Sequence, residues 1–192
     1  MKKVLLLSTS CLFIYSCANN ADKTAATSSD TTKVAASSTT TPAVEYPYTA
    51  TYSSQMEAGD PNNSKKVLDI YKDYDNGNLL AHKEYFADSV EFDLAGGENI
   101  KGTRDSILNI AQKGRSNLKS AEDKIITFIS SHAKDKGENW VSVWTKEIDT
   151  HKDGKIDSII LNENWMLNKD GKIAYMTQLS AKAAAPKEAK KK

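Results

Sequence analysis

Cysteine is nearly absent from this chain: its 192 residues include two, Cys11 and Cys17. Because both lie within the first seventeen residues, a disulfide scaffold is excluded for the remainder, and a packed core has to stabilise any domain there. The longest uncharged apolar stretch, residues 4–15, is shorter than the ~20 residues that span a bilayer. It follows the basic pair Lys2 and Lys3, and such a segment is typical of a secretory signal.

Motifs for nucleophilic catalysis and metal binding are missing too. We find no glycine-rich phosphate loop and no Gly-x-Ser-x-Gly pattern. The three histidines, His82, His132 and His151, are scattered over separate predicted elements, and no His, Cys and Asp spacing fits a zinc site. We therefore expect neither a metal nor a cofactor. Residues 46–180 carry 17 basic and 21 acidic side chains, and this mildly acidic balance argues against nucleic-acid binding.

The apolar stretch ends in Ile14-Tyr15-Ser16-Cys17, which resembles the lipobox of bacterial lipoproteins. The resemblance implies that residues 1–16 are a signal peptide and that Cys17 becomes a lipid-modified N-terminus anchored in a membrane. No acidic run follows Cys17. By similarity to other lipoproteins, we expect a cell-envelope protein on the periplasmic face of the outer membrane rather than at the cell surface.

Composition divides the rest of the chain into three parts. Residues 17–45 are mostly Ala, Ser and Thr, which cannot bury enough surface to offset their ordering entropy, so we predict a disordered tether. Residues 181–192 form a basic tail that we also expect to be disordered. Between them, residues 46–180 have the length of one domain.

Periodicity within residues 46–180 predicts helices first and strands afterwards. An irregular stretch at 46–60 precedes a helix that starts at Asn63 or Ser64 and stops at 76–78, and two more helices are expected at 79–86 and 104–118. Strands are predicted at 89–94, 123–131, 140–148, 156–167 and 173–179. The last three are joined by a repeated Lys-Asp-Gly-Lys-Ile turn, which is typical of hairpins. The order predicts an α+β fold in which about three helices cover an antiparallel sheet.

Short motifs spread over the domain resemble the SnoaL-like, nuclear-transport-factor-2-like superfamily. They are Asn-Gly-Asn-Leu at 76–79, Tyr-Phe-Ala-Asp-Ser-Val at 85–90, Ile-Lys-Gly-Thr at 100–103, Glu-Asn-Trp-Met-Leu-Asn at 163–168 and Asp-Gly-Lys-Ile at 170–173. The resemblance implies a cone-shaped, cystatin-like fold, with a curved antiparallel sheet wrapped around about three helices and a pocket inside. The chain also resembles lipoproteins of this superfamily from Bacteroidetes-type bacteria. The superfamily includes enzymes and non-catalytic binding domains.

Ketosteroid isomerase, an enzyme of this superfamily, uses a carboxylate base and an oxyanion hole made of a tyrosine and a protonated acid. Carried over by resemblance, the base falls at Asp93 and the acid at Glu163. The tyrosine position falls at Ile70, with Tyr71 one residue, or about 100°, round the helix. The alternative is that Asp93 faces solvent at a strand end and that Glu163 is a buried carboxylate satisfied by neighbouring donors.

Aromatic residues could line a pocket for an apolar ligand, or they could simply be core. The residues that we expect on a pocket wall are Tyr71, Tyr85, Trp144, Glu163, Trp165 and Tyr175.

Three hypotheses for function remain open. The leading one is non-catalytic binding of a small apolar or amphipathic molecule or of a protein partner; the others are a small isomerase or cyclase using Asp93 and Glu163, and a structural envelope protein that dimerises through its sheet. An enzyme needs a carboxylate of raised pKa in an open cavity, a binding domain needs the cavity without that carboxylate, and a structural dimer needs only an exposed apolar face.

Overall fold

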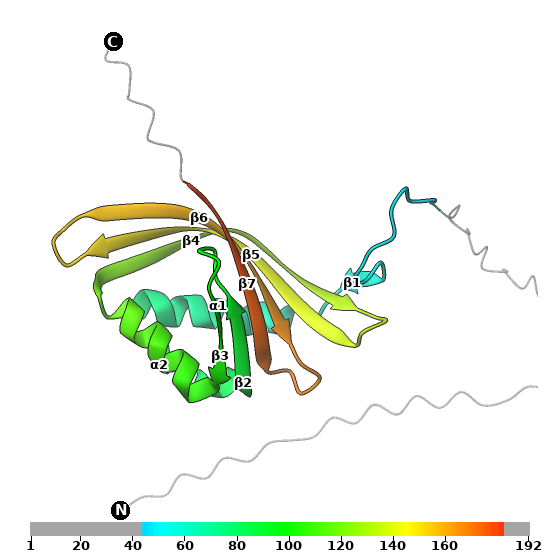
Figure 1. The fold of residues 1–192 in the computed structure, drawn as a ribbon, viewed down its shortest axis with the longest axis horizontal. Helices are drawn as coiled ribbons and strands as arrows, with labels where there is room; N and C mark the ends of the chain where they lie inside the picture. Colours follow the sequence, from blue (N-terminus) through cyan, green and yellow to red (C-terminus); the bar gives the residue numbers. More distant parts are fainter. Residues whose placement is uncertain (1–43, 183–192) are drawn as a thin grey trace, which may run out of the picture. The chain divides into compact units, whose positions relative to one another are not determined.

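The structure is a computed structural model that describes residues 44–182. The predicted signal peptide, Cys17 and most of the tether and basic tail lie outside these residues. Two α-helices pack on the concave face of a curved seven-stranded sheet, so the α+β class is confirmed (Figure 1). The strand order is β1-β4-β5-β6-β7-β2-β3. Within residues 44–182, no helix is both long and apolar enough to cross a membrane.

The first helix, α1 (Pro61–Asn76), begins two or three residues before the predicted start at Asn63 or Ser64. The Asp60 side chain accepts a hydrogen bond of 2.8 Å from the backbone N–H of Asn62, and Pro61 occupies the first turn, where no N–H is needed. Gly77 ends the helix in the left-handed conformation, with φ 73°, as the predicted stop requires. The helix buries Val67, Ile70 and Tyr71 against the sheet.

The predicted helix at residues 79–86 is wrong. Residues 79–82 form turns, Lys83–Tyr85 form a single 3-10 turn (η1), and Phe86 already begins a strand. The stretch is too short to offset the cost of helix nucleation, and His82, which precedes the 3-10 turn, makes no capping bond there. The predicted helix at 104–118 is confirmed as α2 (Arg104–Arg115), capped by the Thr103 hydroxyl.

The predicted meander is confirmed in β4 (Leu118–Ala133), β5 (Glu138–His151), β6 (Ile156–Leu167) and β7 (Ile173–Lys182), which pair antiparallel in that order. Strand β7 extends into the predicted tail. Gly154 and Gly171 supply the positive φ of the two repeated turns.

The sheet is mixed rather than wholly antiparallel. Strand β2 (Phe86–Asp93) lies parallel to β7, because a long stretch of chain separates the two and allows a crossover. Two short strands were not predicted from the sequence. Strand β3 (Asn99–Thr103) forms a hairpin with β2, and β1 (Met56–Ala58) pairs with the end of β4.

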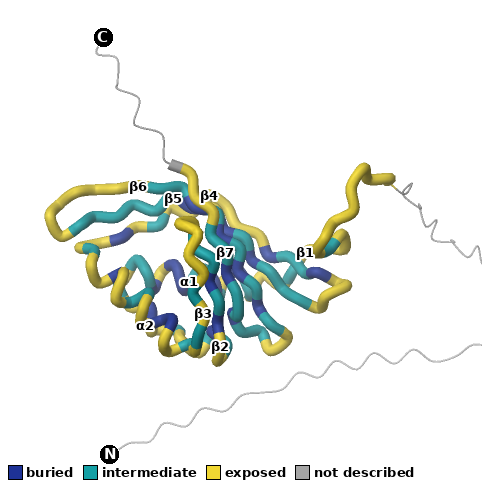
Figure 2. Tube along the Cα trace, viewed as in Figure 1, coloured by how far each residue is buried: buried dark blue, intermediate teal, exposed yellow. Residues whose placement is uncertain are grey.

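The core lies between the helices and the concave face of the sheet, where the buried residues gather (Figure 2). Alternate residues of β6, from Leu161 to Leu167, are buried, because successive side chains of a strand point to opposite faces of the sheet. The largest fully buried side chains include Phe86, Leu108 and Leu167.

Candidate functional site

A cavity of about 400 Å³ lies between the helices and the concave face of the sheet. Its volume is that of a typical small-molecule site. Helices α1 and α2, strands β2 to β7 and the turns after α1 and β2 all contribute to its wall. A pocket is therefore present between the helices and the sheet, and it is partly open to solvent.

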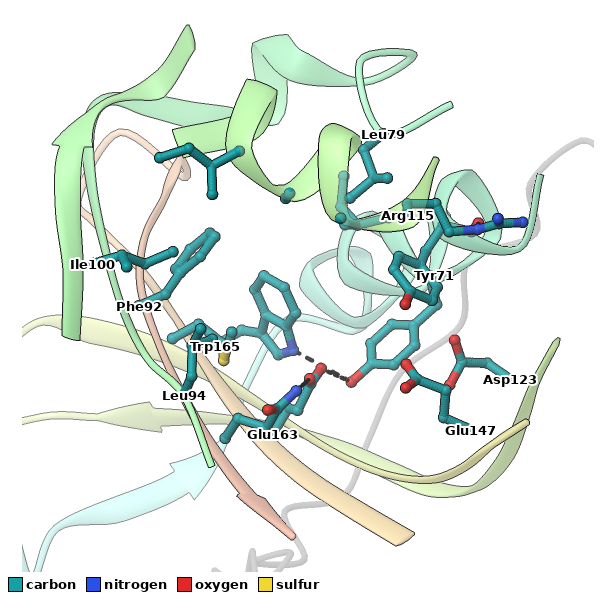
Figure 3. Close-up of a pocket in the computed structure, with 17 residues that line it drawn as sticks. Tyr71, Leu79, Phe92, Leu94, Ile100, Arg115, Asp123, Glu147, Glu163 and Trp165 are labelled. Carbon is teal, nitrogen blue, oxygen red and sulfur yellow. Dashed lines mark hydrogen bonds between the residues drawn. The ribbon is translucent and has the colours of Figure 1, made fainter. Parts of the chain in front are cut away.

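One side of the cavity is apolar. Figure 3 shows Phe92, Leu94 and Ile100 on this side, with the Trp165 indole between them and the polar residues. The Phe92 and Trp165 rings meet edge to face, with their centroids 6.0 Å apart. These side chains offer a contact surface for a hydrocarbon or a ring.

A hydrogen-bonded group around Glu163 forms the centre of the wall. The Tyr71 hydroxyl donates to Oε2 of Glu163, and the Gln178 amide donates to Oε1 at 2.7 Å. The Trp165 indole N–H lies 3.5 Å from the Tyr71 hydroxyl oxygen. Both oxygens of this buried carboxyl group are thus satisfied, as the structural alternative for Glu163 proposed.

Two further acidic residues, Asp123 of β4 and Glu147 of β5, line the side opposite the apolar residues (Figure 3). They are directly paired across the two strands, so both side chains emerge on the concave face. Oδ1 of Asp123 accepts a hydrogen bond of 2.9 Å from the Thr145 hydroxyl. Among the described residues, the Glu147 carboxyl group has no hydrogen-bond donor.

Burial in this cavity shifts the pKa of each carboxyl group upward. Desolvation, reinforced by repulsion from neighbouring acids, raises the pKa of Asp123 to about 7 and that of Glu147 to about 8. Desolvation also raises the pKa of Glu163, against its hydrogen bonds from Tyr71 and Gln178. At neutral pH, the wall therefore holds carboxyl groups that can keep or release a proton.

Arg115 is the only basic residue on the wall within the described part of the chain. Its guanidinium donates to the backbone carbonyls of Tyr74 at 2.7 Å and Asp75 at 3.0 Å. It also lies over the Tyr74 ring, 5.5 Å from the centroid. These contacts fix Arg115 to the end of α1 and not to Asp123, Glu147 or Glu163.

Three of the six residues predicted to line a pocket, Tyr71, Glu163 and Trp165, lie on the cavity wall. The other three are not among the residues that line this cavity. Tyr85 belongs to η1 and stacks on His82, with ring centroids 4.8 Å apart. Trp144 lies between the buried Val143 and Thr145, and Tyr175 precedes the buried Met176 of the cavity wall, so both rings are on the outer face of the sheet.

Asp93 and Glu163 are not brought together. Asp93 lies on the outer face of β2, because its neighbour Phe92 faces the core. Its carboxylate accepts hydrogen bonds from the Asn99 amide, at 2.6 Å, and from the Tyr175 hydroxyl, and these donors lower its pKa. A lowered pKa and an outward orientation remove Asp93 as the base of a Glu163 site. The phenol that does reach Glu163 is that of Tyr71 and not a residue at position 70.

Asp123 and Glu147 were missed by the sequence reasoning. A usable signal existed for Glu147, because it continues the alternate series Val141, Val143 and Thr145, all of which are buried. No such signal marks Asp123, since a register shift between Ile125 and Thr127 breaks the alternation of β4.

Strand β4 carries the exposed apolar side chains of Ile126, Phe128 and Ile129, along the part of the strand that β1 does not pair with. Dimerisation through the sheet stays a prediction. The described residues contain no group of three or more His, Cys, Asp or Glu side chains that could hold a metal ion.

Comparisons with known proteins find similarity in structure only. No family model matches the chain, and no curated protein matches it. Among solved structures, AusH of Aspergillus nidulans aligns with a TM-score of 0.52 and 8% identity, covering 67% of this chain and 89% of its own. IdmH of Streptomyces antibioticus, a candidate polyketide cyclase, aligns with a TM-score of 0.50 and 14% identity, over 62% and 91% of the two chains. An NTF2-like protein of unknown function from Burkholderia pseudomallei aligns with a TM-score of 0.50 and 14% identity, covering 61% of this chain and 88% of its own.

Proposed function

We propose that this domain, which has the nuclear-transport-factor-2-like fold, binds a small amphipathic molecule in the cavity between its helices and its sheet. One observation carries the proposal: a cavity of about 400 Å³ has apolar side chains on one side and a few convergent polar groups on the other. Such a division is the usual composition of a small-molecule site, in which apolar contact supplies affinity and polar groups fix orientation.

The proposal is tested by filling the cavity. Gly114 of α2 lines the wall, and a Cβ atom added there meets no other atom within 4 Å, so Gly114→Phe places a ring at the cavity without a clash at its base. The apolar fluorophore N-phenyl-1-naphthylamine serves as the probe, because its emission rises in apolar surroundings. We expect the parent protein to bind it and Gly114→Phe to bind it at least about tenfold more weakly, a loss of about 1.4 kcal/mol.

Lys113→Phe is the matched control, because Lys113 is exposed on the same helix and does not line the cavity. This variant should bind the fluorophore as the parent does. Equal weakening by both variants, or no binding by the parent, would contradict the proposal.

A second candidate function is general acid–base catalysis, and the pKa values of Asp123 and Glu147 favour it. A catalytic acid or base works best when its pKa is near the working pH, and these groups have pKa values of about 7 and 8 on an open wall. The apolar ketone 2-tetralone in deuterium oxide provides a test. If the site abstracts a proton, NMR should show deuterium entering beside the carbonyl faster than in buffer, and Glu147→Gln should remove the acceleration. A rate equal to that of buffer would contradict it.

We also propose that Cys17 carries a lipid that anchors the domain at the periplasmic face of the outer membrane. The support is the sequence Ile14-Tyr15-Ser16-Cys17 alone. Radiolabelled palmitate should be incorporated into the parent protein and not into Cys17→Ser. Protease added to intact cells should spare an inward-facing domain and digest one at the cell surface.

A further inference from the structure

We propose that the ligand of this cavity is an organic cation, an amphipathic amine whose ammonium group binds between Asp123 and Glu147 while its apolar part contacts Phe92, Ile100 and Trp165. This inference rests on the proposed function, because it assigns the chemical class of the molecule that the cavity binds. Three observations support it: the acidic residues on the wall outnumber the basic ones, Asp123 and Glu147 are paired across two strands, and some of their carboxyl oxygens have no hydrogen-bond donor among the described residues.

The cavity wall carries an excess of acid. Its ionisable groups include the carboxyl groups of Asp123, Glu147 and Glu163, against the single guanidinium of Arg115. That guanidinium is already bonded to two backbone carbonyls of α1. An anionic ligand would therefore find no free cation among the described residues of the wall and would oppose ionisation of the carboxyl groups, whereas a cation would favour their ionised form and bind to it in a site of low dielectric.

Asp123 and Glu147 are directly opposed across β4 and β5. Like charges at directly opposite positions destabilise a sheet, and no lysine or arginine of the described residues forms an ion pair with either. A cation placed between them would turn this repulsion into two attractive contacts. A cation bound at this site would therefore explain why two acidic residues stand at directly opposite positions.

The acceptor atoms of the three acids are not equally free. Both oxygens of Glu163 accept hydrogen bonds, from Tyr71 and Gln178, so Glu163 connects the elements that form the wall. Asp123 has one oxygen bonded to Thr145, and Glu147 accepts no hydrogen bond from the described residues. An ammonium group has three N–H donors and suits this set of open carboxylate oxygens.

The acidic surface continues beyond the cavity. A second hollow shares Glu147 and follows β5 outward to Asp149, whose Oδ1 is buried without a hydrogen-bond partner. Asp157 lies further along it but is paired with His151 and Lys155. Glu147 and Asp149, which form no ion pair with a described residue, therefore lie together in this second hollow and favour the approach of a cation over that of an anion.

Three probes that share one hydrocarbon chain test the proposal: octylamine, octanol and octanoate. Binding of each to the full-length chain, carrying Cys17→Ser so that no lipid is attached, is measured by titration calorimetry at pH 8. We expect octylamine to bind at least about tenfold tighter than octanol, and octanoate to bind more weakly than both. Glu147→Gln should bring octylamine to within about threefold of octanol and leave octanol unchanged, and Asp123→Asn should act in the same direction.

Glu91→Gln is the control, because Glu91 is an acid of β2 outside the cavity whose carboxylate is bonded to Lys101 and Asn99. This change should leave all three affinities as they are. A loss of octylamine binding in Glu91→Gln equal to that in Glu147→Gln would show a general effect of surface charge and would overturn the proposal.

Proton release supplies a readout that a merely apolar pocket does not give. A bound cation favours carboxylate over carboxylic acid, so octylamine should release protons near pH 7, where the groups of the wall are partly protonated. The groups that face Glu147 are Tyr74 and Asp75 of α1, Arg115 of α2, Asp123 of β4, Asp149 of β5 and Glu163 of β6. The apparent binding enthalpy in Tris and in phosphate should therefore differ for octylamine and agree for octanol.

The outcomes separate the two proposals. Equal affinities for octylamine and octanol, or tighter binding of octanoate, would overturn the proposal that the ligand is a cation. They would not contradict the proposal that the cavity binds a small amphipathic molecule. Failure of all three probes to bind, while the protein unfolds cooperatively, overturns both.

Discussion

Replacing Glu147 by glutamine should stabilise the domain at pH 9 and leave its stability almost unchanged at pH 5. The side chain of Glu147 is largely buried on the cavity wall, and desolvation together with repulsion from Asp149, Asp123, Glu163 and Asp75 raises its pKa from 4.5 to about 8. A carboxyl group whose pKa is raised in the folded state binds more protons there than in the unfolded chain. Its contribution to stability is therefore lost as pH rises from 4.5 through about 8. Glutamine removes the titration and keeps the shape.

The magnitude follows from the two pKa values. At 1.36 kcal/mol per pKa unit, a group with values of 4.5 unfolded and about 8 folded costs about 4 kcal/mol between pH 5 and pH 9. Part of the rise comes from neighbouring acids that titrate over the same range. We therefore expect Glu147→Gln to be more favourable at pH 9 than at pH 5 by about 2–4 kcal/mol in the free energy of unfolding.

Urea unfolding of both proteins at the two pH values measures this difference. Comparing the same substitution at pH 5 and pH 9 cancels any packing change that glutamine introduces, since that change does not depend on pH. Glu91→Gln is the control and should show no gain at pH 9, because hydrogen bonds from Lys101 and Asn99 lower the pKa of Glu91. A Glu147→Gln effect that is the same at pH 5 and pH 9 would refute the reasoning.

Three further results are expected. Tyr71→Phe should lower the free energy of unfolding by about 1–3 kcal/mol, measured in urea, because it removes a donor to the buried Glu163 carboxyl group; an unchanged midpoint would contradict this role. Leu108→Ala should cost about 2–5 kcal/mol in the same assay, because Leu108 is only 1% exposed, and a cost below that range would show that the core there is loosely packed. The hydrogen bond to Asp73 raises the pKa of His82, so its NMR titration midpoint should lie above 6.5 and fall in Asp73→Asn. The stability from that bond should be present below pH 6.5 and lost as pH rises through the raised pKa.

Local patterns were enough to predict most strands and helices of the domain. The repeated Asp-Gly turns defined the hairpins of β5, β6 and β7, and glycine at position 77 ended α1 as expected. The parallel pairing of β2 with β7 could not be predicted in this way, because a strand's sequence does not specify which distant strand it will join. The residues at 79–86 failed for a different reason: an apolar spacing of about one turn also fits a chain of turns that leads into a strand.

The candidate site was predicted only where a side chain's orientation followed from its own strand. Glu163 and Trp165 lie on the buried face of β6, and regular alternation places them there. Asp93 was assigned by resemblance, and alternation with the buried Phe92 directs it outward. Asp123 and Glu147 become a pair only through the register between β4 and β5, which depends on long-range packing and a break in regular pairing.

The position of β7 between β6 and β2 bears on the order in which this chain can fold. On one side of β7 lie β1, β4, β5 and β6, and on the other lie β2 and β3, so the two groups share no edge until the final strand is in place. A nascent chain that has not yet released residues 173–182 has every helix of the described domain but cannot close its sheet. Because β2 pairs with a strand far along the sequence, the domain completes its sheet only after residues 173–182 have been synthesised, and folding should be slow compared with that of helical domains of similar size.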